Sequence, residues 1–218
     1  MDKLRLRFEQ TGRARWISHL DTMRTLQRAM LRAGVPIRYS EGFNPHALLS
    51  ILMPLSVGSE SLCQLCDIRV REDADLAALP ASLTAVRPEG LRVTEAYEDG
   101  DKPAGLKWLE AEGLWEYDTA DPARTAEVCR ALFAAPVQVT RRTKRGEGLF
   151  TITEHIRALE FLPEPGAVRV RCTVSCADPV VNPDLITAAV AQNLPEAAPD
   201  AAHFTRLALY KADGEPFR

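Results

Sequence analysis

Two imidazole side chains near the beginning of the chain have the chemistry of general acids and bases. His19 stands in the string ISHLD at residues 17–21, and His46 closes the string YSEGFNPH at residues 39–46. Two histidines that a fold brings together can exchange protons with a substrate at neutral pH. His19 and His46 are therefore the candidate catalytic residues. The alternative is that both imidazoles satisfy local backbone groups, because no third group that would orient them stands out.

Basic and aromatic side chains in the same region predict the binding of phosphates and bases. Residues 1–46 hold nine Lys or Arg against four Asp or Glu, although the whole chain carries a net charge of −3. Arg24, Arg28 and Arg32 recur every four residues, so on a helix they would form one row that could follow a phosphate backbone. The residues that we expect to contact nucleic acid here are Arg13, Arg15, Arg24, Arg28, Arg32, Arg38, Tyr39, Phe43, Asn44 and His46. The alternative is a solvated helix face beside an ordinary hairpin turn.

The helix that carries this row is predicted to have an ordered start. Ser18 is a favourable N-cap residue, and Asp21 stands three residues later, close to a capping box. Free backbone N–H groups at such a position also favour a bound anion. We therefore expect Ser18, His19 and Asp21 to organise the beginning of the helix.

A second basic segment lies further along the chain, beside a Gly-rich stretch at residues 146–148. Its cations are Arg141, Arg142, Lys144 and Arg145. A basic β-ribbon of this kind could reach across to nucleic acid, so the four residues join the predicted binding set. The alternative is an exposed hairpin whose charges prevent edge-to-edge aggregation.

The five cysteines predict buried thiols rather than a metal site. Cys63 and Cys66 have the spacing of half a zinc site, but residues three apart on a strand point to opposite faces. Cys172 and Cys176 would share a face and still lack partner ligands. An odd number of cysteines, no signal peptide and no apolar run of roughly 18 residues indicate a reduced, cytoplasmic protein outside the membrane. No nucleotide-binding loop or iron–sulfur motif occurs, so neither a metal nor a cofactor is expected.

Hydrophobic periodicity predicts the order β-α-β-β-α-β, with one extra short strand, in the first half of the chain. The predicted strands are 4–8, 35–40, 48–55, 62–70 and 91–97, and the predicted helices are 18–33 and 73–86. This order is that of the ferredoxin-like, or split βαβ, arrangement, in which two helices cover one face of an antiparallel sheet.

The second half of the chain is predicted to repeat this plan after a polar linker at residues 98–103. Strands at 137–144 and 155–162 would flank a loop at 146–148. The sequence therefore predicts an α+β fold of tandem ferredoxin-like domains with antiparallel sheets. The predicted domains are residues 1–100, which carry the basic surface, and residues 105–218.

These motifs resemble a bacterial family of unknown function, the domain of unknown function 2344, whose members are encoded beside, or fused to, radical S-adenosylmethionine (radical SAM) enzymes. The strings that carry the resemblance are RLRF at 5–8, ISHLD at 17–21, YSEGFNPH at 39–46, PLSVG at 54–58, TKRG at 143–146 and NPD at 182–184. The resemblance runs over nearly the whole chain and implies a role in RNA modification or processing. Residues 150–152 read Phe-Thr-Ile where the family tends to read Ile-Asp-Ile, which removes a carboxylate from the basic hairpin.

Three functions are compatible with these observations. The first is an accessory protein that binds tRNA or ribosomal RNA for a radical SAM enzyme acting in trans. The second is a metal-independent enzyme that cleaves or modifies RNA with His19 and His46. The third is an adaptor whose basic face docks the radical SAM enzyme. We expect the first, which requires positive side chains of the opening strand, the first helix and the turn after the second strand to share one accessible surface.

Overall fold

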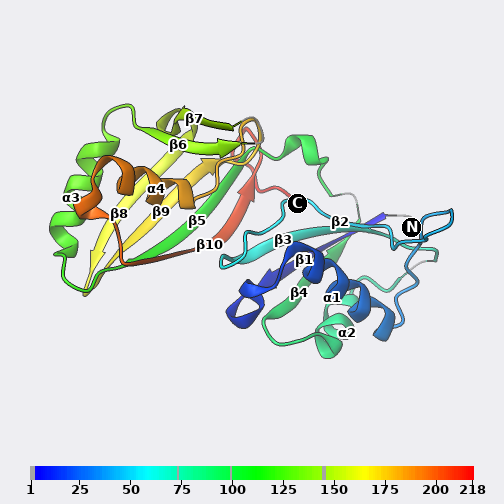
Figure 1. Cartoon of the computed structure of the whole chain (residues 1–218). Coiled ribbons are helices and arrows are strands. Elements are labelled where there is room, and N and C mark those ends of the chain that lie inside the picture. Colours follow the sequence, from blue (N-terminus) through cyan, green and yellow to red (C-terminus); the bar gives the residue numbers. More distant parts are fainter. Residues whose placement is uncertain (1–2, 73, 99, 144–145) are drawn as a thin grey trace. The chain divides into compact units, whose positions relative to one another are not determined.

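The chain folds into two compact units, each built from a sheet and helices (Figure 1). The structure, a computed structural model, describes residues 3–72, 74–98, 100–143 and 146–218, with the backbone alone for 142 and 143. One unit comprises residues 1–103 together with Arg218, and the other comprises residues 104–217. The α+β class with antiparallel sheets that the sequence predicts is confirmed.

The first unit has the strand order of a split βαβ fold. Its elements are β1 (Lys3–Gln10), the 3-10 turn η1 (Gly12–Trp16), α1 (His19–Arg32), β2 (Leu49–Ile51), β3 (Glu60–Arg69), α2 (Leu79–Val86) and β4 (Leu91–Tyr97). Strand β1 pairs with β3 and with β4, and β2 pairs with β3, all antiparallel. The resulting order β4-β1-β3-β2 is the one that the ferredoxin-like arrangement requires.

The core of the first unit lies between one face of this sheet and the two helices. Alternate residues of β1, namely Leu4, Leu6 and Phe8, are fully buried against Leu26 and Met30 of α1. Because successive side chains of a strand point to opposite faces, the basic residues between them lie on the face that the helices leave uncovered. Because of this apolar–basic alternation, the cations of β1 lie on the opposite face of the sheet from the helices and their arginines.

Three elements of the first unit are shorter than the sequence predicts, and one of them, the strand predicted at 48–55, is only β2 (Leu49–Ile51). The predicted strand at 35–40 reduces to two isolated bridges, Ile37 with Val70 and Tyr39 with Ala47. Pro36 has no N–H to donate, and the chain beyond Tyr39 turns out of the sheet. The predicted helix at 73–86 begins only at Leu79, because the residues before it form a turn around the Asp75 side chain.

The second unit repeats the strand order of the first and carries an insertion. Its elements are β5 (Trp108–Glu116), α3 (Pro122–Phe133), β6 (Gln138–Thr143), β7 (Gly146–Thr151), the 3-10 turn η3 (Ile152–His155), β8 (Ile156–Glu164), β9 (Ala167–Ser175), α4 (Asp184–Asn193) and β10 (Ala201–Tyr210). The sheet order β10-β5-β9-β8 is antiparallel throughout. Strands β6 and β7 form a separate two-stranded sheet between α3 and β8.

The inserted hairpin corrects the predicted loop at residues 146–148. These residues belong to β7, and β6 pairs with β7 rather than with the strand at 155–162. Glycine weakens a strand, so Gly-Glu-Gly reads as a loop from the sequence alone. In the hairpin Gly148 pairs with Arg141, and a Cβ at position 148 would meet no atom within 4 Å.

Aromatic residues fill the core of the second unit. Trp115, Phe161 and Phe204 are almost completely buried, and the rings of Trp115 and Phe161 lie 5.6 Å apart. A Cβ at position 113 would lie 2.5 Å from the Phe204 ring, so Gly113 is what lets this ring pack across β5. Substitution at this position is therefore expected to displace a core aromatic side chain.

The five cysteines lie in these cores, and none of them forms a disulfide. Burial raises the pKa of the Cys66 and Cys172 thiols to about 12, and that of Cys129 to about 11. Only the thiolate is nucleophilic, so we expect these three thiols to resist a thiol reagent at pH 8 in the folded protein and to react within seconds in denaturant. Counting labelled cysteines by mass spectrometry before and after unfolding checks this, and rapid native labelling of Cys66 would contradict it.

Candidate nucleic-acid interface

Ser18 organises the beginning of α1. Its hydroxyl accepts a hydrogen bond from the Asp21 N–H at 3.2 Å and donates one to the Asp21 carboxylate at 2.7 Å. These contacts with Ser18, and then one from Arg24, hold the pKa of the Asp21 carboxyl below its usual value. His19 is the first residue of α1; its side chain is half-buried and has no hydrogen-bond partner among the described residues. The cap fixes where α1, and with it the arginine row, begins.

The arginine row occupies the exposed face of α1. Arg24, Arg28 and Arg32 are all exposed, on the side of the helix away from the buried Leu26. Arg24 donates to Asp21 at 3.1 Å, and this pair is exposed at both ends. An exposed ion pair contributes only about 0–1 kcal/mol, so a phosphate can displace the carboxylate at little cost. The row is therefore accessible to an anion along two turns and more of the helix.

The two arginines before α1 lie in η1 and differ in their surroundings. Arg13 is exposed. The Arg15 guanidinium lies 4.9 Å from the centroid of the exposed Trp16 ring and 3.7 Å from the Glu60 carboxylate. The Trp16 ring packs on Gly58, where an added Cβ would approach it to 3.3 Å. Arg15 is thus held in place by protein groups, whereas Arg13 is open to solvent.

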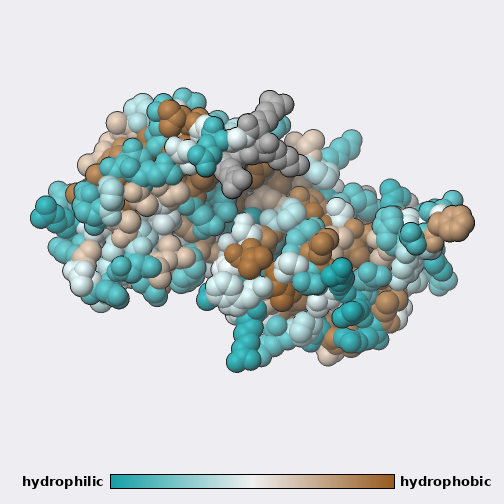
Figure 2. Space-filling model, in the orientation of Figure 1, coloured by the Kyte–Doolittle hydropathy of each residue, from teal (hydrophilic) through white to brown (hydrophobic). Residues whose placement is uncertain are grey.

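A closed loop at residues 40–46 projects from the first unit. The Ser40 N–H donates to the His46 carbonyl at 2.8 Å, the His46 N–H donates to the Ser40 hydroxyl at 3.1 Å, and that hydroxyl lies 2.8 Å from His46 Nδ1. Residues 41–46 are all exposed, and Phe43 is fully exposed. At the right edge of Figure 2 this segment appears as a hydrophilic projection that ends in a hydrophobic group. The loop therefore presents an aromatic ring, and Asn44 beside it, to a binding partner.

Further arginines surround the base of this loop. The Tyr39 hydroxyl lies 3.5 Å from Gln27 Nε2 of α1, and the Arg71 guanidinium lies 6.0 Å from the Tyr39 ring centroid. Arg38, Arg69 and Arg71 are exposed where β3 ends. Arg69 and Arg71 are absent from the predicted binding set. Arg69 is the last residue of β3, and Arg71 lies two residues beyond it.

The structure does not bring His19 and His46 together. The loop that holds His46 leaves the sheet beside Val70, at the Lys3 end of β1, whereas His19 follows the other end of that strand. The two histidines thus lie toward opposite ends of α1, whose fourteen residues span about 20 Å. A general acid and base that act on one group must both reach it within hydrogen-bond distance. The geometry gives no support to a catalytic pair.

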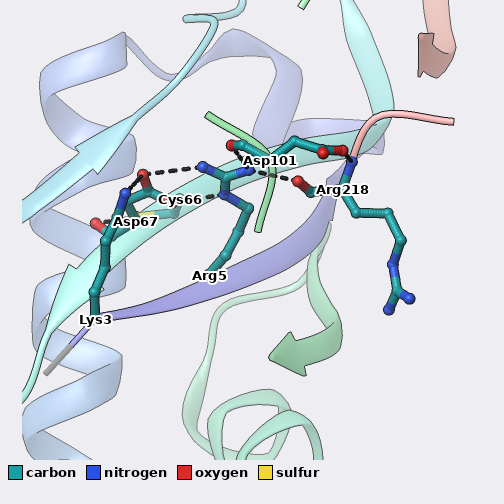
Figure 3. A network of polar contacts seen from close by, with 6 residues as sticks. All are labelled: Lys3, Arg5, Cys66, Asp67, Asp101 and Arg218. Atoms are coloured by element: carbon teal, nitrogen blue, oxygen red, sulfur yellow. Dashed lines mark hydrogen bonds and ion pairs between the residues drawn. The ribbon is translucent and has the colours of Figure 1, made fainter. Parts of the chain in front are cut away.

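The arginines of the opening strand do not share the surface of the helix row, which corrects the expectation of one convergent surface. Arg5 is only 2% exposed. Its guanidinium donates to the Asp67 carboxylate at 2.6 and 3.1 Å, and to the main-chain oxygens of Asp101 and Arg218 at 2.8 and 2.6 Å. Figure 3 shows this network. Arg7 pairs with Glu95 on the same face. Burial and pairing make Arg5 structural, and the half-exposed Arg7 lies with it on the face opposite the arginine row of α1.

The inserted hairpin of the second unit holds a stack of three side chains. The Arg141 guanidinium lies 4.0 Å from the Phe150 ring centroid, and the Phe150 and His155 rings are stacked 4.9 Å apart. Arg141 also approaches the Val180 carbonyl at 3.5 Å. The other three predicted cations of this segment fall outside the described side chains; they are Arg142, Lys144 and Arg145.

Phe43 gives a direct test of base contact. Because its ring packs against nothing in the first unit, Phe43→Ala is expected to change the free energy of unfolding by less than about 0.5 kcal/mol. If the ring stacks on a base, the same change weakens RNA binding by about 1–3 kcal/mol, measured by fluorescence anisotropy. Phe43→Leu is the matched control, because it keeps an apolar group and removes the ring face. Full binding by the Leu variant would contradict stacking.

Within the described residues no helix has the length and apolar character needed to cross a membrane. In the same residues no group of three or more His, Cys, Asp and Glu side chains is placed to hold a metal ion.

Comparisons with solved structures give distant likenesses. A chain of the crystal structure of a Cbf5-Nop10-Gar1 complex matches with 10% identity and a TM-score of 0.46, over 93% of this chain and 47% of that chain. A chain from the crystal structure of an unknown protein from Galdieria sulphuraria matches with 10% identity and a TM-score of 0.24, over 94% of this chain and 98% of that chain. This chain therefore spans about half the length of the first of these. Scores at this level carry no argument about function.

Comparison with curated proteins gave no match. A family model does match, over residues 3–196, which cover most of both units and include every predicted site residue. The model is described as "uncharacterized protein conserved in bacteria (DUF2344)". The chain belongs to this bacterial family.

Proposed function

We propose that this protein binds RNA, tRNA or ribosomal RNA, through the first unit, as an accessory to a radical SAM enzyme that modifies or processes that RNA. The observation that carries the proposal is the combination of the exposed arginine row of α1 with the closed loop that holds Phe43 in solvent. Arg24, Arg28 and Arg32 would bind phosphates, and the loop would contact an unpaired base.

The surroundings of these groups favour a long polyanion over a small ligand. The arginines are spread along α1, whose residues rise 1.5 Å each, so Arg24 and Arg32 are separated by about 12 Å along the helix axis. That spacing suits successive phosphates of a chain, and Arg71, whose guanidinium lies 6.0 Å from the Tyr39 ring centroid, adds a positive charge at the base of the loop.

Binding of labelled tRNA and ribosomal RNA fragments over a range of salt concentrations tests the proposal. We expect the logarithm of the affinity to fall linearly with the logarithm of salt, and loop or bulge RNA to bind more tightly than a perfect duplex. Intact RNA after long incubation with the protein is expected of an accessory protein. Affinity no greater than that of a charge-matched acidic protein for the same RNA would refute RNA binding.

A second candidate function is docking of the radical SAM enzyme itself, and an apolar patch beside the arginine row favours it. Trp16, Leu20 and Val57 are exposed, and Trp16 packs on Gly58, next to Val57. Exposed apolar groups beside a charged surface are common where two proteins meet. If this patch docks the enzyme, Trp16→Ser weakens co-purification with a radical SAM enzyme after nuclease treatment, whereas Arg28→Glu does not. The opposite pattern would assign the docking to the basic face of α1, and loss of the wild-type complex on nuclease treatment would assign the contact to RNA.

A further inference from the structure

The sheet of the second unit has a face that α3 does not cover. Trp115 of β5 packs on Phe161, which in turn contacts Phe133 of α3, so these rings mark the face that the helix covers. Along β5, Leu109 is buried like Trp115, whereas Trp108 is half-buried. Because successive side chains of a strand point to opposite faces, Trp108 lies on the face opposite α3. This face of the antiparallel sheet is open to a ligand.

Two cations flank the Trp108 ring. Lys107 Nζ lies 6.0 Å from the ring centroid, and the Arg157 guanidinium carbon lies 5.9 Å from it. In the inserted hairpin, by contrast, the Arg141 guanidinium lies 4.0 Å from the Phe150 centroid, in contact with the ring. Distances of about 6 Å are the outer limit of a cation–π contact. Both cations therefore stand beside the Trp108 ring without closing it off.

Arg157 reaches Trp108 from a bulge in β8. The register of β8 with β9 shifts between Ile156 and Ala158, which leaves Arg157 as the extra residue. A bulge re-aims the side chain of its extra residue, and bulges are over-represented next to functional sites. Strand β9 lies between β8 and β5, and its small Ser175 pairs with Trp108. The exposed Arg157 side chain therefore crosses β9 to approach the ring.

Neither cation has an anionic partner among the residues that the structure describes. Arg157 makes no hydrogen bond or ion pair there, and Lys107 Nζ donates to a backbone carbonyl at 3.4 Å and to no carboxylate. On the same face of the sheet, Arg169 and Arg171 both donate to the Glu112 carboxylate. Those two arginines are thus held by an acid, whereas the charges beside Trp108 are available to an anion.

Tyr210 adds a second flat ring beside Trp108. The two residues pair directly across β10 and β5, so both side chains lie on the same face. The Tyr210 hydroxyl donates to the Glu110 carboxylate at 2.5 Å. This bond turns the carboxylate toward β10, whereas Arg157 approaches from β8 on the other side of β5. The acid nearest to Trp108 along β5 is therefore already engaged.

We propose that this face binds an unpaired nucleotide of RNA, with its base stacked on Trp108 and its phosphates at Lys107 and Arg157. Unpaired bases stack on aromatic side chains whatever their sequence, and neighbouring cations hold the backbone. A base inside a double helix offers no free face to the ring, so the site selects single-stranded segments. The choice of RNA rests on the proposed function, which the site extends to the second unit.

The fluorescence of Trp108 tests the site directly. Of the three tryptophans Trp115 is fully buried, so Trp16→Phe leaves Trp108 as the accessible one. The full-length protein with Trp16→Phe and Arg24→Glu/Arg28→Glu, which removes the α1 surface, is titrated with hexaadenylate. We expect saturable quenching of roughly half of the Trp108 emission, and little quenching by a blunt RNA duplex. No quenching by hexaadenylate would overturn the site.

Trp108→Phe and Trp108→Leu distinguish stacking from packing, because both shorten the side chain and only Phe keeps a ring face. With the α1 surface intact, the Leu variant is expected to lose roughly five- to a hundredfold in affinity for single-stranded RNA, and the Phe variant to keep most of it. Equal losses in the two variants would overturn stacking on Trp108.

Arg157→Gln tests the phosphate contact, because this exposed side chain lies outside the core. It is expected to weaken RNA binding several-fold and to reduce the slope of the salt dependence by about one. The matched control Arg124→Gln removes an exposed arginine of α3, on the other side of the sheet, and should bind normally. Full affinity of Arg157→Gln would overturn the phosphate assignment.

The α1 surface and the Trp108 site fail separately in these experiments. If Arg24→Glu/Arg28→Glu keeps full RNA affinity while Trp108 is still quenched, the α1 assignment is wrong and this site stands. If the protein with Trp16→Phe alone binds RNA and Trp108 is not quenched, this site is wrong and the α1 surface stands.

Discussion

Arg24→Glu/Arg28→Glu is expected to lower RNA affinity roughly a hundredfold at moderate salt and to reduce the slope of the salt dependence by roughly two. Both side chains are exposed, and each would lose one phosphate contact and add a repulsive charge. Because neither side chain packs in the core, the thermal unfolding midpoint should stay nearly constant. Filter binding or anisotropy at several salt concentrations gives both quantities.

The matched control for this double change is Arg124→Glu, which reverses an exposed arginine on α3 of the second unit. It alters the net charge in the same direction without touching α1. If the control and the α1 variant lose the same RNA affinity per unit of charge changed, binding depends only on the overall charge of the protein. In that case the assignment of phosphates to α1 fails.

Asp67→Asn is expected to have the largest effect on stability, a loss of about 3–5 kcal/mol in the free energy of unfolding of the first unit. The change removes the Asp67 carboxylate from the buried Arg5 guanidinium. Lys3 also contacts Asp67, at 2.9 Å, but it is 51% exposed, so Lys3→Met should cost at most about 1 kcal/mol. Hydrogen exchange of peptides from β1 and β3, together with urea unfolding, separates the first unit from the second.

Acid provides an independent check on the same network. Burial alone would raise the pKa of the Asp67 carboxyl, but the hydrogen bonds and charges of Arg5 and Lys3 outweigh it and hold the pKa below its usual value. A depressed pKa stabilises the fold above the unfolded value, which is about 3.9, and the contribution is lost as the pH falls below it. We expect the wild type to lose stability in that window more steeply than Asp67→Asn. If the free energy of unfolding falls with pH equally in the wild type and in Asp67→Asn, the Asp67 carboxylate is not the partner of Arg5.

Local patterns were enough to predict much of the first unit. The alternation of Leu4, Leu6 and Phe8 predicts β1 and its buried face, and Ser18 predicts the start of α1. These signals work because each depends on the residue's own neighbours in the chain. The loop at 40–46 was also predicted as exposed functional sequence, since a plain turn does not require its aromatic and polar side chains.

Features that depend on distant residues could not be predicted in the same way. The partner of Arg5 is Asp67, and no local pattern relates residues 62 positions apart. Strand β7 was missed because pairing with β6, rather than the intrinsic preference of Gly146 and Gly148, makes it a strand.

Each unit has an additional segment at the same place in the order of its elements. The loop at 40–46 lies between the first helix and the second sheet strand of its unit, and the β6–β7 hairpin lies between α3 and β8, the equivalent elements of the other unit. Lengthening a surface connection costs little conformational entropy. Each of these two connections can therefore gain or lose residues while the sheets stay unchanged. Evolution, or a protein engineer exchanging one insertion for the other, can therefore change the exposed segment of either unit without altering the core that holds the unit together.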